Sequence, residues 1–526
     1  MPSTKGHFYY GTQRLTPGSA LDISRRSLKG QLNPESKKRI NKSNGVIDAI
    51  LEEEKVVYGI NTGFGSLCKS IISRENTQKL QDNLIRSHSV GVGEPVPLSI
   101  VRLMIILKIH SLALGYSGIS LKVIERLMWL LEKDYIPYVP TKGSLGASGD
   151  LAPLAHLFLP LIGLGQLYYN GSFADTGLVY KKENIAPLTL GPKEGLALIN
   201  GTQFIASYAI DVLERLYVCL ESADIIGAMS LEGILGSAKP FDEDLHKLRP
   251  FKGNQHVAYR LRNLLHKSEM VASHAQCGRV QDPYSIRCMP QVHGASRKAW
   301  LHLMELTEVE LNSVTDNPVI FNKDKTISGG NFHGQPLAMP LDYCGIAASE
   351  LGNISDRRTY LLLEGNIEGL PELLMRDTGI NSGFMMPQYT SAALVSENKS
   401  LCFPASADSI PTSLGQEDHV SMGSISARKT RQIIENLEYI LAVELLCAAQ
   451  AFDYRKPLKS SKILEACHDL IRKKIDHAEE DRIFANDIKI AHQLITSKEL
   501  LKLTYSIAEK EKINLKGPYY GLFGFH

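Results

Sequence analysis

Apolar side chains recur along most of this chain at the spacing of α-helices. Between residues 121 and 131, leucine, isoleucine and methionine repeat every three or four positions, with charged residues between them. That period places the apolar groups on one face of a helix. Comparable patterns run from 297 to 314, from about 336 to 363 and from 424 to about 454. The chain is therefore predicted to be mainly α-helical.

The longest of these patterns predicts a helix that needs partners. About 30 helical residues span about 45 Å, because each residue adds about 1.5 Å. A helix of that length packs against others, as in a bundle. Strand-like alternation is confined to 135–139 and to a pair of segments at 319–321 and 326–328. We expect a mainly α fold: a long-helix bundle with a smaller mixed N-terminal part that carries the active-site loops.

The same patterns suggest a division of the 526 residues into three parts. Residues 1–20 are predicted to form an N-terminal tail. Residues 21–200 are predicted to form an N-terminal domain that contains a glycine-rich loop, and residues 201–526 to form the long-helix bundle with the C-terminal helices.

Composition and charge exclude several classes of protein. Hydrophobic residues make up 44% of the chain and charged residues 22%, values typical of a globular protein. Lys and Arg number 58 against 56 Asp and Glu, so no charge excess predicts nucleic acid or a membrane as a partner. Eight cysteines without a CxxC pair, and an N-terminus without an apolar core segment, favour a cytoplasmic location. Neither an HExxH motif nor a dinucleotide fingerprint occurs, so neither a metal nor NAD is predicted.

One glycine-rich segment, Gly143–Asp150, has the sequence GSLGASGD. Its simplest interpretation is a tight loop, with Asp150 as the N-cap of the helix that follows. Backbone cyclisation is the alternative. The nitrogen of Gly149 would attack the carbonyl carbon of Ala147, and Ser148 would become dehydroalanine as two waters leave. The product is a methylidene-imidazolone ring with an electrophilic exocyclic carbon.

Six segments, in order along the chain, resemble the aromatic amino acid lyases, a family of histidine, phenylalanine and tyrosine ammonia-lyases and related aminomutases. They are 58–65, 143–156, 200–203, 281–288, 329–334 and 416–423. The resemblance implies that Ala147, Ser148 and Gly149 form the methylidene-imidazolone autocatalytically, without an external cofactor. It also implies a small amino-acid substrate and a homotetramer whose active sites combine residues of three subunits.

Two of the residues in these segments would carry the main polar chemistry. By the resemblance, Tyr58 is the base that removes a β-proton from the substrate. An ordinary tyrosine has a pKa near 10, so the site must stabilise its phenolate with positive potential or hydrogen bonds. Arg287 would bind the substrate carboxylate through its planar, always charged fork. The structural alternatives are a core tyrosine and an internal salt bridge.

Four further residues are assigned by the same resemblance. Tyr284 is expected beside the prosthetic ring, as a proton shuttle or an orienting group. Asn200 is expected to hydrogen-bond the ring carbonyl, although an Asn-Gly turn explains it equally well locally. Asn331 and Phe332 resemble residues of the substrate pocket, and Phe332 is equally compatible with an ordinary core position.

Several features favour histidine as the substrate. Ser87-His88 resembles the selectivity position of the histidine enzymes, although some tyrosine lyases share it. Glu417 is the stronger signal, because its carboxylate can accept the N–H of an imidazole or exchange a proton with it. Gln416 and Met385 also resemble pocket residues of that group, as do Gln203 and the segment 290–294. A structural histidine and a surface pair are the alternatives for His88 and Glu417.

Two departures put the substrate in question more than the chemistry. Leu414-Gly415 stands where the histidine enzymes commonly have Ala-Asn, and Cys402-Phe403 precedes Pro404 where they usually have a histidine. The chain is therefore predicted to deaminate L-histidine to urocanate and ammonia. Tyrosine or phenylalanine ammonia-lyase and 2,3-aminomutase activity of the same family are the alternatives, and an inactive scaffold paralogue is the alternative from another class.

Overall fold

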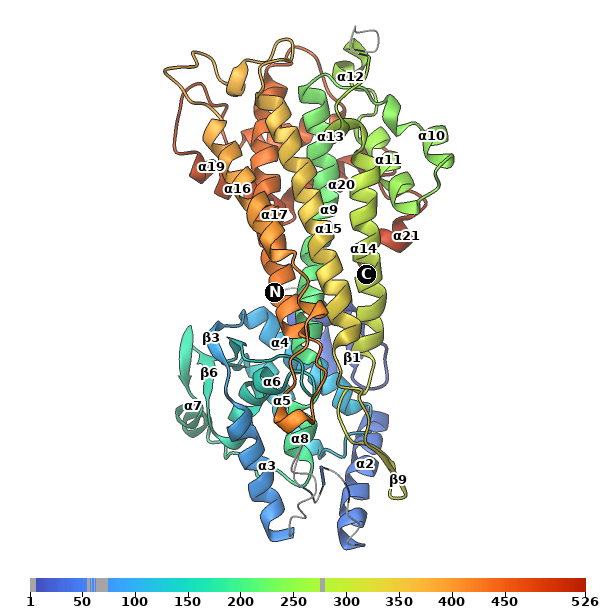
Figure 1. Ribbon diagram of the computed structural model, residues 1–526, viewed down its shortest axis with the longest axis vertical. Helices are drawn as coiled ribbons and strands as arrows, with labels where there is room; N and C mark the ends of the chain where they lie inside the picture. The colour runs from blue at the N-terminus through green and yellow to red at the C-terminus, as the bar shows by residue number, and fades with distance from the viewer. Residues whose placement is uncertain (1–5, 54–56, 58, 61, 63–73, 275–279) are drawn as a thin grey trace.

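Four long helices run side by side through the upper part of the molecule (Figure 1). They are α9 (Gln203–Gly233), α14 (Met289–Leu311), α15 (Gln335–Leu363) and α17 (Gly423–Asp453). The computed structural model describes residues 6–53, 57, 59–60, 62, 74–274 and 280–526. The long patterns of the sequence are confirmed, and α14 begins at Met289, eight residues before the start expected from its pattern.

Helix α9 lies at the centre of this bundle. Nearly all of its side chains are buried, because α14, α15 and α17 pack around it. Further helices complete the upper part. They are α10 (Glu243–Lys247), α11 (Lys252–Leu264), α12 (Glu269–Ser273), α13 (Tyr284–Arg287), α16 (Met385–Leu401), α18 (Lys462–Arg472), α19 (Phe484–Thr496), α20 (Glu499–Lys510) and α21 (Tyr520–Phe523).

The N-terminal residues form a smaller part at the other end of the bundle (Figure 1). Its helices are α1 (Pro17–Ser24), α2 (Pro34–Glu52), α3 (Arg74–His88), α4 (Leu98–Ala113), α5 (Leu121–Lys133), α6 (Leu151–Phe158), α7 (Thr176–Glu183) and α8 (Glu194–Ile199). The stripe between 121 and 131 falls within α5, where Val123, Ile124, Leu127 and Leu130 are buried as expected.

Short strands join these helices, as the mixed N-terminal part requires. β4 (Ile136–Pro137), β6 (Gln166–Tyr169) and β7 (Ser172–Asp175) form an antiparallel sheet. β3 (Val92–Pro95) pairs with β5 (Pro140–Lys142), and β1 (His7–Tyr9) pairs in parallel with β2 (Lys29–Gln31). The hairpin predicted at 319–328 is confirmed as β8 (Val319–Asn322) and β9 (Lys325–Ile327).

A continuous hydrophobic core extends across the expected boundary at residue 200. Residue 200 lies between α8 and α9, yet one buried apolar cluster includes side chains from both sides of that point. Residues 1–20 are not a simple tail, because His7–Tyr9 form β1 and Tyr10 and Leu15 are buried. Among the described helices, none is long and apolar enough to cross a membrane.

Candidate active site

The glycine-rich loop folds into a tight turn between β5 and α6. The nitrogen of Gly149 donates to the carbonyl oxygen of Gly146 at 3.2 Å. Ser148 has a φ of +50° and Gly149 a φ of +82°, both in the left-handed region that residues with side chains rarely adopt. A Cβ on Gly149 would lie only 2.2 Å from the carbonyl oxygen of Gly201, so this approach requires glycine.

Asp150 has a different role from the one predicted. It stands at the N-cap position of α6, but its side chain makes no capping bond to that helix. Its Oδ2 instead accepts from the backbone N–H groups of Phe204 at 2.9 Å and Ile205 at 3.0 Å, in the first turn of α9. Those N–H groups have no acceptor within their own helix. Asp150 is fully buried, and this burial raises the pKa of its carboxyl group to about 7.

A cleft of about 560 Å³ opens beside this turn. It brings together predicted site residues from four segments that are far apart in sequence. These are Ala147, Ser148, Asn200, Phe332, Gln416 and Glu417. The loop that precedes α17 supplies the last two, and it runs down from the bundle to the N-terminal part (Figure 1).

Two oxygen atoms at this cleft lack partners. The Oδ1 of Asn200 and the Oε2 of Glu417 are buried, and neither forms a hydrogen bond with any described residue. A buried polar atom without a partner costs about 1–3 kcal/mol, which a bound molecule can recover. The backbone of Asn200 is well held, because its carbonyl oxygen accepts from the Nζ of Lys108 at 2.5 Å. The side chains at the cleft therefore have unused capacity for polar recognition.

Some lining residues were not singled out in the sequence. His333 and His419 both line the cleft, and their rings stack with centroids 5.8 Å apart. Asn317 donates through Nδ2 to the Oγ of Ser328 at 3.0 Å, and both residues also line it. The sequence signal for the two histidines was their position next to predicted site residues. His333 directly follows Phe332, and His419 lies two residues after Glu417.

The departures from the histidine enzymes fall outside the cleft lining. Leu414 is 95% exposed and Phe403 is 82% exposed, and neither is among the residues that line it. Asn331 is exposed and donates through Nδ2 to the carbonyl oxygen of Val314 at 3.1 Å. It too is absent from the lining, whereas its neighbour Phe332 is present.

Four further predicted residues, besides Asn331, do not line this cleft within one chain. Tyr284 and Arg287 lie on α13 and Met385 begins α16, in the upper part of the bundle (Figure 1). The guanidinium of Arg287 lies 4.4 Å from the centre of the Tyr284 ring, and Tyr284 is 71% exposed. His88 ends α3, where its Nδ1 lies 2.8 Å from the carbonyl oxygen of Leu84.

Of the remaining predicted site residues, some bind structural partners and one lies outside the residues that the structure describes. His293, in the segment 290–294, is fully buried with its Nδ1 2.8 Å from Asp224, so it serves the bundle core. Gln203 donates to the Oγ1 of Thr315 at 2.9 Å behind the cleft. Tyr58 lies outside the described residues, while Thr62 lines the cleft.

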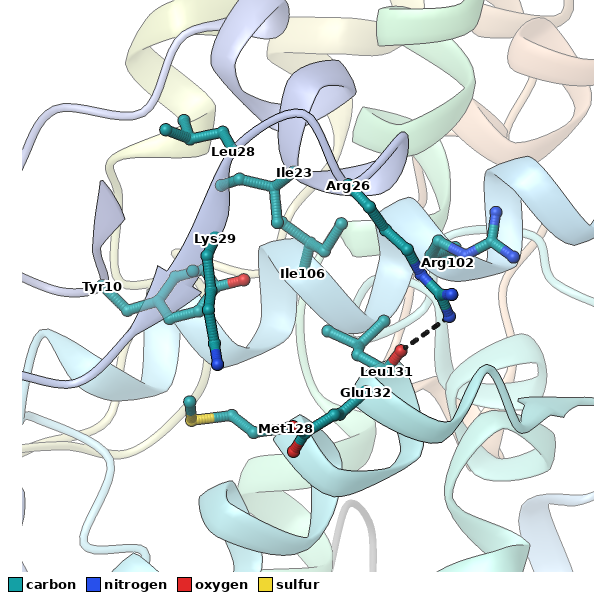
Figure 2. Close-up of a pocket in the computed structure, with 11 residues that line it drawn as sticks. Tyr10, Ile23, Arg26, Leu28, Lys29, Arg102, Ile106, Met128, Leu131 and Glu132 are labelled. Carbon is teal, nitrogen blue, oxygen red and sulfur yellow. Dashed lines mark hydrogen bonds between the residues drawn. The ribbon is translucent and has the colours of Figure 1, made fainter. Parts of the chain in front are cut away.

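A second cavity, of about 270 Å³, lies between α1, β2, α4 and α5 (Figure 2). Its walls are largely apolar, and Arg26 donates across it to the carbonyl oxygen of Leu131 at 3.4 Å. Arg102 and Arg26 both pair with Asp134, whose single negative charge offsets one of their two positive charges. None of the predicted site residues lines this cavity. The cleft beside Ser148 is therefore the candidate active site.

Comparison with known proteins gives one consistent result. A family model described as aromatic amino acid lyase matches residues 15–473. Histidine ammonia-lyase of Natranaerobius thermophilus is 48% identical over 473 residues, which cover 90% of this chain and 93% of that protein. The crystal structure of histidine ammonia-lyase from Trypanosoma cruzi has a TM-score of 0.89 at 40% identity, over 98% of this chain and 97% of the other. Tyrosine aminomutase from Streptomyces globisporus has a TM-score of 0.90 at 34% identity, over 96% and 98%.

Proposed function

The chain belongs to the aromatic amino acid lyase family, and we propose that it catalyses the non-oxidative deamination of L-histidine to urocanate and ammonia. This makes it a carbon–nitrogen lyase. The proposal rests on the convergence, in one cleft, of the Ser148 turn with oxygens of Asn200 and Glu417 that have no partner within the described part of the chain.

The family uses a methylidene-imidazolone group, and we propose that Ala147, Ser148 and Gly149 supply it here. Their turn already places the nitrogen of Gly149 within a four-residue bend. Ala147 carries only a methyl group, and Gly149 has none, so little obstructs ring closure. Asn200 lines the cleft, where the N–H groups of its Nδ2 would donate to the ring carbonyl. Its Oδ1, which has no partner among the described residues, can accept a hydrogen bond from the substrate. When present, the ring supplies the electrophile that takes the substrate amine.

Glu417 is the group that favours an imidazole substrate. Its Oε2 has no partner among the residues that the structure describes, and Glu417 lines the same cleft as Ser148. An imidazole N–H donates to such an oxygen, whereas a phenyl ring would leave the carboxylate buried and unpaired. Discrimination of this kind follows from unpaired polar groups in the site. Gln416, next to it on the cleft, can add a further polar contact with the substrate.

The residues that do not reach the cleft lead us to propose an oligomeric site. Tyr284, Arg287, Met385 and His88 keep their proposed roles only if another copy of the chain, or a further segment, brings them to the substrate. Helix α15 offers a surface for such an assembly. Its exposed side chains Met339, Tyr343, Ile346 and Tyr360 are separated by four, three and fourteen residues, the last close to four full turns, so they share one face. We propose a homotetramer in the cytoplasm.

Substrate identity is tested with a panel of amino acids. Purified protein is incubated separately with L-histidine, L-tyrosine and L-phenylalanine, and the absorbance of each unsaturated acid is followed. We expect urocanate from histidine alone. Coumarate or cinnamate without urocanate would favour the tyrosine or phenylalanine lyases. A β-amino acid would indicate an aminomutase, and no product from any substrate would favour a scaffold.

A further inference from the structure

Lys108 is a buried lysine close to the candidate active site. It lies in α4, where every residue from Leu103 to Ala113 is buried, and it is 1% exposed. Burying an ammonium group is expensive unless a carboxylate pairs with it. The structure pairs the nearby Lys193 with Asp316 at 2.9 Å, but among the described residues no carboxylate forms an ion pair with Lys108. The position of this charge therefore requires an explanation.

The contacts of Lys108 lead directly to the Ser148 turn. Its Nζ donates to the carbonyl oxygen of Asn200 at 2.5 Å. In the same peptide group, the nitrogen of Gly201 donates to the carbonyl oxygen of Ser148 at 3.5 Å. A donor on one side of a peptide group polarises the N–H on the other side, because the two are conjugated. The ammonium of Lys108 is thus linked to the Ser148 carbonyl through a single peptide group.

The geometry of this link is tightly constrained. The carbonyl oxygen of Gly201 accepts from the nitrogen of Asp150 at 2.8 Å, which holds the two segments side by side. A Cβ on Gly201 would lie 2.5 Å from the Oε1 of Gln203, so a larger residue would push that side-chain amide aside. The same Oε1 is the second acceptor for Lys108, at 3.4 Å. These contacts keep the ammonium in line with the Asn200–Gly201 peptide.

We propose that Lys108 is a positioning residue that brings positive charge, through the Asn200–Gly201 peptide, to the carbonyl oxygen of Ser148. The inference rests on the proposed function, because that oxygen acquires negative charge as the turn cyclises. During dehydration the Cα–H and Cβ–O bonds of Ser148 break, a Cα=Cβ bond forms, and the proton and hydroxide leave as water. As the Cα–H bond breaks, the electron pair that it leaves behind is shared with the carbonyl group of Ser148.

Ring closure accounts for the second water molecule. A bond forms between the nitrogen of Gly149 and the carbonyl carbon of Ala147. The oxygen of Ala147 leaves as the second water, with one proton from the Gly149 amide and one from the Ser148 amide. The Ser148 carbonyl is retained and remains conjugated with the new double bond. Positive charge near this oxygen therefore also favours later addition of an amine to the β-carbon.

The surroundings of Lys108 allow its charge to vary near neutral pH. Asp316, Lys193 and Asp150 are the charged groups that face it from the neighbouring segments. Burial lowers the pKa of Lys108 from 10.5 to about 7, despite the attraction of the two carboxylates. The proposed role needs the ammonium form of Lys108, which is more populated below pH 7 than above it.

The test replaces Lys108 with neutral residues and measures ring formation without substrate. K108M removes both the charge and the hydrogen bond, whereas K108Q keeps a neutral donor. S111A is the matched control, because Ser111 lies in the same helix as Lys108 but does not contact the Asn200–Gly201 peptide. The substitution removes a 3.1 Å hydrogen bond from Ser111 to the carbonyl oxygen of Ser313. Each protein is made in a cell-free system, and intact mass follows the loss of two waters with time. The kcat and KM for histidine are measured on the matured protein.

We expect K108M to mature about tenfold more slowly and to lose about tenfold in kcat, with KM little changed, and K108Q to be intermediate. S111A should mature at the wild-type rate. Wild-type rates of water loss in both Lys108 variants would overturn the inference, and if K108M does not fold, K108Q decides. A wild-type chain that loses two waters but makes no urocanate refutes the proposed function alone. A wild-type chain that loses no water refutes both.

Discussion

The approach of Gly149 to Gly201 makes G149A a sharp test of the turn. A Cβ at this position would lie 2.2 Å from the carbonyl oxygen of Gly201 and 3.0 Å from that of Phe332. Both neighbours are backbone atoms, so neither can rotate away as the end of a side chain would. The residue would also hold a φ of +82°, which costs a side chain about 1–2 kcal/mol.

The expected loss of stability is the sum of these two effects. Overpacking of a buried site costs about 1–3 kcal/mol, which with the backbone strain gives about 2–5 kcal/mol. G171A is the matched control, because Gly171 has a φ of +90° but a Cβ added there would meet no atom within 4 Å. It should lose only the backbone contribution of about 1–2 kcal/mol.

Urea unfolding of both variants at equal protein concentration measures this difference, and intact mass reports ring formation in each. We expect G149A to be the less stable variant and to lose water poorly, while G171A matures as the wild type does. Equal losses of stability in the two variants would refute the steric argument. Normal maturation of G149A would show that the turn does not need the observed approach.

The remaining predictions concern individual side chains. S148A should fold normally by circular dichroism and make no urocanate, and retained activity would refute the role of Ser148. Y58F should lower kcat far more than it changes KM, and a change in KM alone would show that Tyr58 is not the base. E417Q should reduce kcat/KM for histidine by about ten- to a hundredfold, and unchanged kinetics would remove the main support for an imidazole substrate. Burial raises the pKa of Asp150 from 3.8 to about 7, so its neutral form is favoured in the fold. The free energy of unfolding should therefore fall by up to about 4 kcal/mol as pH rises from about 4 to about 7. D150N, which has no carboxyl group to titrate, should not show this decrease. Parallel curves of unfolding free energy against pH for the two proteins would contradict the prediction.

Much of the fold could be predicted because long apolar periods specify long helices directly. The ends of α15 and α17 follow the pattern closely, and the hairpin at 319–328 was evident from its alternation and polar turn. Six strands were missed, because segments of three or four residues carry too little alternation to stand out; they are β1, β2, β3, β5, β6 and β7.

The partners of the site residues were harder to predict than their identities. Asp150 was expected to cap α6, the helix that follows it, because local sequence cannot reveal that α9 begins beside it in space. Lys108 lies in the largely apolar helix α4, and only the structure shows that its ammonium reaches Asn200. Tyr284, Arg287 and Met385 could be assigned by motif, but no pattern within one chain indicates which copy of the chain they serve.

The proposed chemistry requires that Ala147, Ser148 and Gly149 have condensed into an electrophilic ring. Peptide mapping of freshly prepared protein by mass spectrometry tests it most directly. We predict that the peptide containing these residues is lighter by two water molecules, with the loss located at Ala147–Gly149. A peptide with the full mass of the encoded sequence would contradict the account, whatever the similarity of the chain to its relatives.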